Sequence, residues 1–356
     1  VEWETYKATT TPALSYCITS QQTNQPLTKI ECSMSSINDS NSSYEGSHVT
    51  IVEGKKFYVR HWKPKEANSS PPKGLVVLYH GLGAHSGYPT VRYAAEFLQE
   101  DGFAVVAVDF PGHGQSDGLP GYIPSSDELI ANGVAMVEYA TSLYQTNKDD
   151  KDDGVNTSPR LVLCGSSMGG AIAQAVAHRL SKEKEQPRPD PLVMLLAPML
   201  MLNVSGLERT ALQCLSYVVP TAKLIPSSAT DASKQYRDPT KRQECEDDEL
   251  TNSGNLRIGS VLTCVDLTLH VQSIASEMTC PYLLMIADED VVVKNEGSEQ
   301  LWNRTDKVSD KTKKHYPGTK SPTKPRLHPS TTYHSVSRYV FCFTFSLSLS
   351  LSLRAT

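Results

Sequence analysis

Leu161-Val-Leu-Cys-Gly-Ser-Ser-Met-Gly-Gly170 is the most informative segment of this 356-residue chain. The run from Leu161 to Cys164 is short and apolar, which is typical of a strand buried on both faces. It leads directly into a Gly-x-Ser-x-Gly pentapeptide centred on Ser167. Residues 171–180 are rich in alanine and predict a helix. Strand, tight turn and helix in this order are the context of a nucleophile elbow.

The residue types in this segment suit that elbow. Ser167 is expected at the apex of a strained turn, with its hydroxyl clear of the sheet. Gly165 and Gly169 lack a Cβ, so strand and helix can approach closely. The N–H of Met168 begins the helix and is expected to stabilise an oxyanion on the attacked carbonyl. The alternative is a glycine-rich turn with a buried serine, but the flanking strand and helix favour a nucleophile.

A second turn is expected to complete the oxyanion hole. The apolar run at 74–79 predicts a strand that ends in His80-Gly-Leu-Gly83, and the N–H of Leu82 is the expected second donor. We expect His80 to brace this loop and His85 to lie at the rim of the loop or pocket. The turn-rich segment 111–118, which follows a predicted strand, is expected to brace the elbow.

The third catalytic group is expected at the end of the strand predicted at 281–286. An acid at the carboxyl end of such a strand fits the chain order Ser, Asp, His. Asp288, Glu289 and Asp290 compete for the position, and we favour Asp290 with Asp288 as the alternative. Its role would be to orient a histidine and stabilise the imidazolium that forms.

The chain is expected to divide into a leader, a main domain and a tail. Residues 1–46 are rich in Ser, Thr and Asn and predict a disordered leader. A hairpin at 49–62 begins the main domain, which extends to residue 318. Strands at 103–110 and 191–198 and helices at 91–102 and 127–144 complete an alternating pattern, which predicts an α/β fold with a mostly parallel central sheet flanked by helices.

The strand pattern stops between residues 199 and 276, which we interpret as an inserted helical cap. It contains apolar helical segments at 207–219 and 261–274 and an acidic run at 244–249. Inserted after the nucleophile, such a cap would cover the active site. Its apolar residues either line an acyl pocket, face a membrane or form the core of the cap itself.

Taken together, these motifs resemble the α/β-hydrolase fold, and within it the monoacylglycerol lipases and lysophospholipase-like hydrolases, which carry a serine aminopeptidase S33-type domain. The resemblance implies a serine esterase acting on monoacylglycerol or related lipid esters, with Ser167 as nucleophile, Leu82 and Met168 as oxyanion amides and Asp290 as the aspartate. It covers roughly residues 47–318, and the matching segments are 80–87, 109–118, 165–171, 196–203 and 281–285.

The chain departs from the family at its end. The family has Tyr-Pro-Gly-x-x-His, whereas here Tyr316-Pro-Gly318 is followed by Thr, Lys and Ser321, so the position of the general base holds a serine. His328 and His334 are weak substitutes, because nothing in the tail holds them in place, and His315 is expected to point away from the site. We expect little or no turnover from the chain as written.

Residues 319–356 do not resemble the family. The strict Ser-Leu alternation at 346–353 suits a strand with one apolar face or translated non-coding sequence, such as a retained intron. We favour the second interpretation, so this tail is expected to be disordered or mistranslated.

The composition limits the classes of binding partner that we expect. The net charge of −5 gives no indication of nucleic-acid binding, and the eight cysteines show no zinc-ligand or disulfide spacing. We expect a small lipid ester as substrate, no metal and no cofactor, and peripheral membrane contact through the cap. The location stays open, with the cytoplasm or a membrane periphery favoured. The alternatives are an inactive ligand-binding member of the fold, or a peptidase or other esterase.

Overall fold

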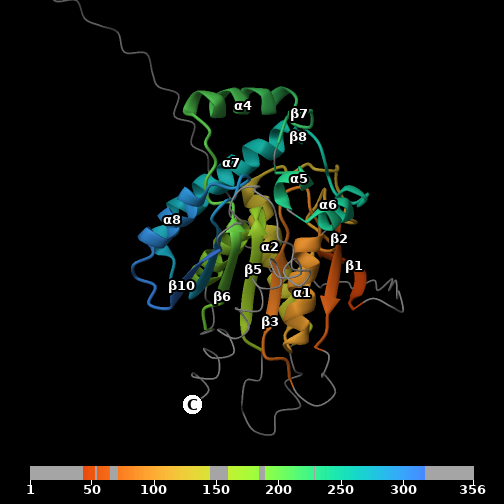
Figure 1. Ribbon diagram of the computed structural model, residues 1–356, viewed down its shortest axis with the longest axis vertical. Helices are drawn as coiled ribbons and strands as arrows, with labels where there is room; N and C mark the ends of the chain where they lie inside the picture. Colours follow the sequence, from red (N-terminus) through yellow and green to blue (C-terminus); the bar gives the residue numbers. More distant parts are fainter. Residues whose placement is uncertain are drawn as a thin grey trace, which may run out of the picture. The chain divides into compact units, whose positions relative to one another are not determined.

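An eight-stranded, mostly parallel sheet organises the chain in the computed structural model (Figure 1). The strand order is β1-β2-β4-β3-β5-β6-β9-β10, and only the β1–β2 and β2–β4 pairs are antiparallel. This confirms the predicted fold class. The strands are β1 (Glu45–Val52), β2 (Lys55–Trp62), β3 (Leu75–Tyr79), β4 (Ala104–Val108), β5 (Leu161–Ser167), β6 (Leu192–Pro198), β9 (Tyr282–Ala287) and β10 (Lys311–Tyr316).

The structure describes residues 43–52, 54–64, 71–144, 159–183, 189–227, 229–236 and 238–316. The first 42 residues of the predicted leader and the whole predicted tail lie outside these ranges. So do Ser321, His328 and His334, and for them the statements made above remain predictions.

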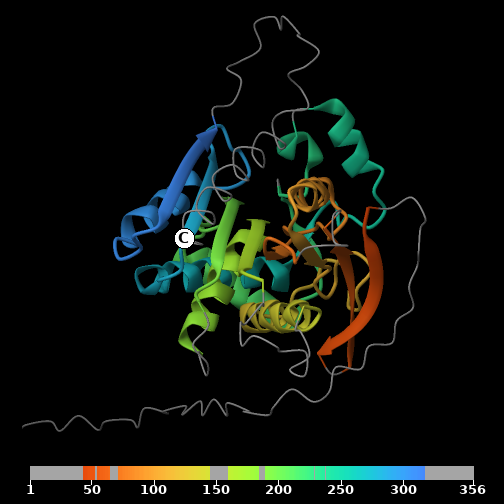
Figure 2. The same cartoon turned by 90° about the horizontal axis from the view of Figure 1, so that it is seen from below.

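Helices cover both faces of the sheet, which explains why its central strands are apolar throughout. All five residues of β3 and all five of β4 are buried, as expected for strands covered on both sides. Helix α1 (Pro89–Glu100) packs on one face and α2 (Ser126–Ser142) on the other (Figure 2). Helices α3 (Met168–Lys182), α7 (Ile258–Ser273) and α8 (Asn295–Arg304) share the core of the α2 face.

The region predicted as a cap contains short elements above one end of the sheet (Figure 1). Helix α7 is anchored in the main core, where the side-chain amide of Gln174 on α3 donates to the carbonyl of Val271 at 2.9 Å. Helix α4, in contrast, has no buried residue. The elements before α7 are α4 (Gly206–Val218), β7 (Lys223–Ile225), α5 (Ala232–Gln235), α6 (Pro239–Glu246) and β8 (Leu256–Arg257).

Candidate active site

Ser167 ends β5 and is the N-cap of α3, and its backbone has a conformation that non-glycine residues rarely adopt. Its φ is 53° and its ψ is −119°, and a non-glycine residue held there costs about 1–3 kcal/mol. The neighbouring glycines make the geometry possible. A Cβ on Gly165 would lie 2.0 Å from the carbonyl oxygen of Gly169, and a Cβ on Gly169 would lie 2.1 Å from that of Tyr79. The close packing of strand on helix therefore holds the serine in place.

The loop after β3 passes beside the Ser167 side chain. A Cβ on Gly81 would lie 3.4 Å from Cβ and 3.9 Å from Oγ of Ser167. Leu82 follows Gly81 directly, so its amide belongs to the same turn. Met168 is the first residue of α3, and the first N–H groups of a helix have no partner within the helix. Both amides predicted for the oxyanion hole thus flank one serine.

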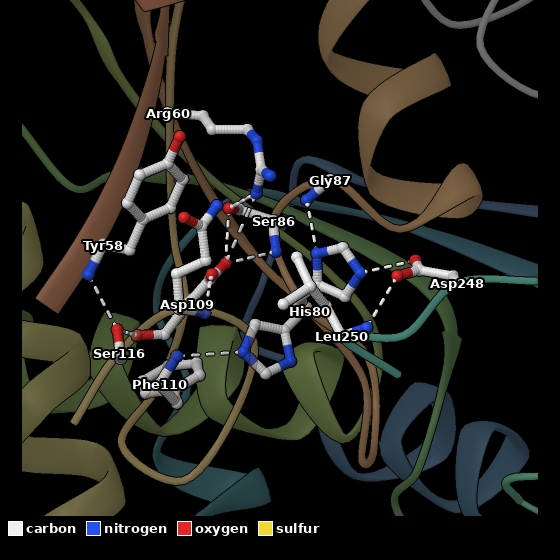
Figure 3. Close-up of polar contacts among 12 residues, drawn as sticks. Tyr58, Arg60, His80, Ser86, Gly87, Asp109, Phe110, Ser116, Asp248 and Leu250 are labelled. Atoms are coloured by element: carbon white, nitrogen blue, oxygen red, sulfur yellow. Dashed lines mark hydrogen bonds and ion pairs between the residues drawn. The ribbon is translucent and has the colours of Figure 1, made fainter. Parts of the chain in front are cut away.

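His80 braces this loop through both of its ring nitrogens. Its Nδ1–H donates to the carbonyl of Gly81 at 2.8 Å. Its Nε2 accepts the N–H of Phe110 at 3.0 Å (Figure 3). The ring is completely buried, and this burial lowers the pKa of His80 well below its usual value. A neutral imidazole with both nitrogens engaged is a structural group, as the sequence analysis expected.

Asp109 holds the far side of the same loop. Its Oδ1 accepts the N–H of Ser86 at 2.6 Å and lies 3.7 Å from the guanidinium of Arg60 (Figure 3). Its Oδ2 accepts the N–H of Gln115 at 2.9 Å. Asp109 is fully buried, and buried carboxylates need such partners. The loop between residues 111 and 118 therefore braces the site, as expected.

The two aspartates at the end of β9 have different partners. Oδ1 of Asp290 accepts the N–H groups of Val292 and Val293 at 2.8 and 2.9 Å. Its Oδ2 has no hydrogen-bond partner among the residues that the structure describes. Asp288 instead accepts a hydrogen bond from Nδ1–H of His315 at 2.7 Å, and Nε2 of that ring lies 3.6 Å from Glu299. Asp290 is thus anchored on one side and open on the other.

The described residues do not supply a general base to Ser167. His315 lies on β10, three strands away from β5 in the sheet order. At roughly 4.8 Å per strand this is a lateral separation of about 14 Å, far beyond a hydrogen bond. In the ranges that the structure describes, no histidine is hydrogen-bonded to Ser167. The expected position of the base, Ser321, lies beyond those ranges.

One contact of the site was not predicted. His85, expected at a rim, is buried and bonded to Asp248 from the acidic run of the cap region. A run of charged residues usually faces solvent. The sequence therefore contains only a weak signal for this pair, namely a histidine in one loop and several acids in another.

Comparisons with known proteins agree with this geometry. The family described as "Serine aminopeptidase, S33" matches residues 70–320. Mouse monoglyceride lipase is 27% identical over 276 residues, which cover 76% of this chain and 81% of the relative. Monoacylglycerol lipase of Mycolicibacterium smegmatis is 27% identical over 267 residues, or 75% and 86% of the two chains. The crystal structure of Paleococcus ferrophilus monoacylglycerol lipase superposes with a TM-score of 0.61 at 23% identity, covering 81% of this chain and 98% of that one.

Proposed function

Because the chain belongs to the serine aminopeptidase S33 family of α/β hydrolases and is similar to monoacylglycerol lipases, we propose that its site is built to hydrolyse monoacylglycerols or related lipid esters at Ser167. The family members to which this chain is similar, such as mouse monoglyceride lipase, are carboxylic ester hydrolases. The observation that carries the proposal is the strained Ser167 between β5 and α3, with the Gly81 turn beside its side chain.

The proposed reaction is acyl transfer to water. A base takes the proton of the Ser167 hydroxyl while Oγ attacks the ester carbonyl. The negative charge on the carbonyl oxygen is stabilised by the N–H groups of Leu82 and Met168. The base then protonates the departing alcohol, and the C–O bond of the ester breaks. Water hydrolyses the acyl-enzyme in the same way and restores the serine.

Asp290 is the proposed partner of the base. Its Oδ1 is fixed by two backbone amides, which leaves Oδ2 to accept a hydrogen bond from an imidazole. Such a bond sets the tautomer of the histidine and stabilises its protonated form. The family pattern assigns the histidine to position 321, where this chain has serine.

The serine at position 321 favours a second candidate for the chain as written. Without a base, the chain keeps the oxyanion amides and the nucleophile but loses several orders of magnitude in rate. It would then bind lipid esters without turning them over.

We also propose that α4 contacts the lipid surface from which the substrate comes. Leu207, Tyr217 and Val218 are 82%, 95% and 78% exposed, and Leu224 on the neighbouring β7 is 60% exposed. Exposed apolar side chains gathered on one element are typical of interaction surfaces. None of the described helices is both long enough and apolar enough to cross a bilayer.

The test uses the full-length chain with a monoacylglycerol substrate, an amino-acid p-nitroanilide run in parallel and a lipid-binding assay. We expect the chain as written to be nearly inactive, and Ser321→His or added imidazole to raise ester hydrolysis by about 100-fold or more. Ser167→Ala in the same background should abolish this gain. Rescue that persists without Ser167 contradicts the proposed nucleophile. Lipid binding without any rescue supports the ligand-binding candidate, and preferred cleavage of the anilide supports a peptidase.

A further inference from the structure

His85, in the loop that carries Leu82, makes a directed bond to the cap region. Its Nδ1 accepts the N–H of Gly87 at 3.1 Å, so in the neutral ring the proton is on Nε2. Nε2–H donates to Oδ2 of Asp248 at 2.6 Å, and Oδ1 of Asp248 accepts the N–H of Leu250 at 3.0 Å (Figure 3). Both carboxylate oxygens are therefore engaged, and each of them accepts.

The Asp248 carboxylate is ionised in this arrangement. Burial alone would raise its pKa, but the hydrogen bond and charge interaction with His85 and the bond from Leu250 hold the pKa of Asp248 below its usual value. A hydrogen bond to an ionised acceptor is about twice as strong as a neutral one. The contact is thus a firm link between the loop and the cap region.

A second link lies next to it on the backbone. The N–H of Asn252 donates to the carbonyl of Gly83 at 2.8 Å. A Cβ on Gly83, whose φ is +77°, would lie 2.8 Å from the carbonyl oxygen of Asn252 and 2.9 Å from Cγ2 of Thr230. Only glycine permits both this conformation and this approach. The side chain of Asn252 also donates to the carbonyl of Gly112 at 3.1 Å.

Further contacts extend the link toward α1. The Tyr88 hydroxyl donates to the side-chain carbonyl of Gln235 at 2.7 Å, and Arg92 pairs with Glu244. Tyr88 and Tyr236 are buried in one small apolar cluster. Residues 230–236 and 238–252, which we call the strap, therefore follow the loop from Gly83 into the first turns of α1.

We propose that the strap sets the position of the Leu82 amide, with Asp248 and His85 as positioning residues. Leu82 lies between two anchors, His80 bonded to Phe110 on one side and Gly83 bonded to Asn252 on the other. The inference rests on the proposed function, because it assigns Leu82 to the oxyanion hole. Displacing a catalytic group by about 1 Å can cost on the order of 100-fold in rate.

The strap should act on kcat and not on KM. The oxyanion exists only in the transition state and the intermediate, so a misplaced donor weakens binding there and leaves ground-state binding unchanged. Loss of folded protein would also lower the apparent kcat at unchanged KM, so kcat is expressed per reactive Ser167, titrated with a serine-directed fluorophosphonate.

The first measurement is hydrogen–deuterium exchange of peptides covering residues 80–88 in the full-length chain, which does not depend on catalysis. In Asp248→Asn the side-chain N–H₂ faces either His85 Nε2–H or the Leu250 N–H, so two donors meet and one of the two hydrogen bonds is lost. We therefore expect the backbone amides of residues 80–88 to exchange about tenfold faster. Asp247→Asn is the matched control, because Asp247 is exposed and accepts from Gln243. Gly83→Ala should reproduce the effect of Asp248→Asn. Unchanged exchange in folded Asp248→Asn and Gly83→Ala chains overturns the strap.

The second measurement is ester hydrolysis with Ser321→His or imidazole present. Asp248→Asn should lower kcat about tenfold and leave KM within about twofold. Adding His85→Gln to Asp248→Asn should lower kcat little further, because both substitutions break the same hydrogen bond. Equal kcat in Asp248→Asn and Asp247→Asn overturns the positioning role. If no form hydrolyses the ester, the proposed function fails, while faster exchange in Asp248→Asn still supports the strap.

Discussion

His315 is paired with Asp288, not with Asp290: its Nδ1 lies 2.7 Å from Oδ1 of Asp288 at the carboxyl ends of β10 and β9. The alternative aspartate of the sequence analysis is therefore already occupied by a histidine that sits about 14 Å to the side of β5. Asp290, two residues further along, uses only Oδ1 in hydrogen bonds among the described residues, which suits the role proposed for its Oδ2 as the acceptor from a base.

The two aspartates should respond differently to loss of charge. In the chain carrying Ser321→His, Asp290→Asn is expected to lower kcat about 10⁴-fold, because the histidine loses the acceptor that fixes its tautomer. Asp288→Asn should change kcat less than about threefold, because its histidine partner does not reach Ser167. Steady-state hydrolysis of a monoacylglycerol measures both. The opposite ranking would make Asp288 the catalytic acid.

Relieving the backbone strain at Ser167 should stabilise the fold while it removes the nucleophile. Ser167→Gly is expected to raise the free energy of unfolding by about 1 kcal/mol, since glycine adopts φ 53° without cost. Ser167→Ala keeps the Cβ and should give no gain. Ser166→Gly is the control, because Ser166 has no positive φ and glycine in a strand costs about 0.5–1 kcal/mol. Urea denaturation measures all three, and equal stability of the Ser167→Gly and Ser167→Ala chains would contradict the strain.

Acid should destabilise the protein through its buried histidines. Burial lowers the pKa of His113 to about 4, whereas an unfolded histidine titrates near 6.5. Between pH 6.5 and 4 the unfolded state binds a proton that the folded state does not, so stability falls as the pH falls, by about 3 kcal/mol over the whole window. Above pH 6.5 this effect is absent.

His113→Asn isolates this contribution. The asparagine amide can donate to the carbonyl of Pro111, as Nδ1–H does at 3.2 Å, but it does not titrate. We expect a shallower fall in the urea midpoint between pH 6.5 and 4 than in the parent chain. Parallel curves for the two proteins would show that His113 does not contribute.

The exposed apolar face of α4 should govern adsorption to lipid. Leu207→Glu with Val218→Glu is expected to weaken co-sedimentation with phosphatidylcholine vesicles about tenfold, because two charges enter the apolar boundary. Leu143→Glu, at the end of α2 and 39% exposed, is the control. In the Ser321→His background, hydrolysis of a short soluble ester should be the same in the double variant, the Leu143→Glu control and the parent. Equal sedimentation of the double variant and the control would contradict lipid contact through α4.

The parts of the fold that were predicted have local signatures. The buried strands β3, β4, β5, β6 and β9 are short apolar runs bounded by turn residues, and the elbow has its pattern within ten residues. Strand β10, Lys-Thr-Lys-Lys-His-Tyr, lies at the sheet edge and is polar, so its composition alone gives no strand signal. Helix α8 was not predicted either, since only Gly297, Ser298 and Leu301 are buried.

The candidate site divides in the same way. Ser167, Met168 and Leu82 were placed by two short motifs, and the structure puts the turns that carry them side by side. The strap was not predicted, because Asp248 belongs to an acidic run whose members look equivalent in sequence. Which of them turns inward depends on the approach of Asn252 to Gly83, a contact between distant parts of the chain.

The bond between His85 and Asp248 closes a loop of 163 residues, and this has a consequence for biosynthesis. At about 5–20 residues per second, Asp248 leaves the ribosome on the order of ten seconds after His85. Ser167, the elbow glycines and the His-Gly turn are all synthesised before the strap that we propose positions the Leu82 amide. During that interval the turn that carries Leu82 lacks its bonds to Asp248 and Asn252, and Asp290, after β9, is synthesised later still. The contacts that fix this turn are therefore long-range contacts that form late in synthesis.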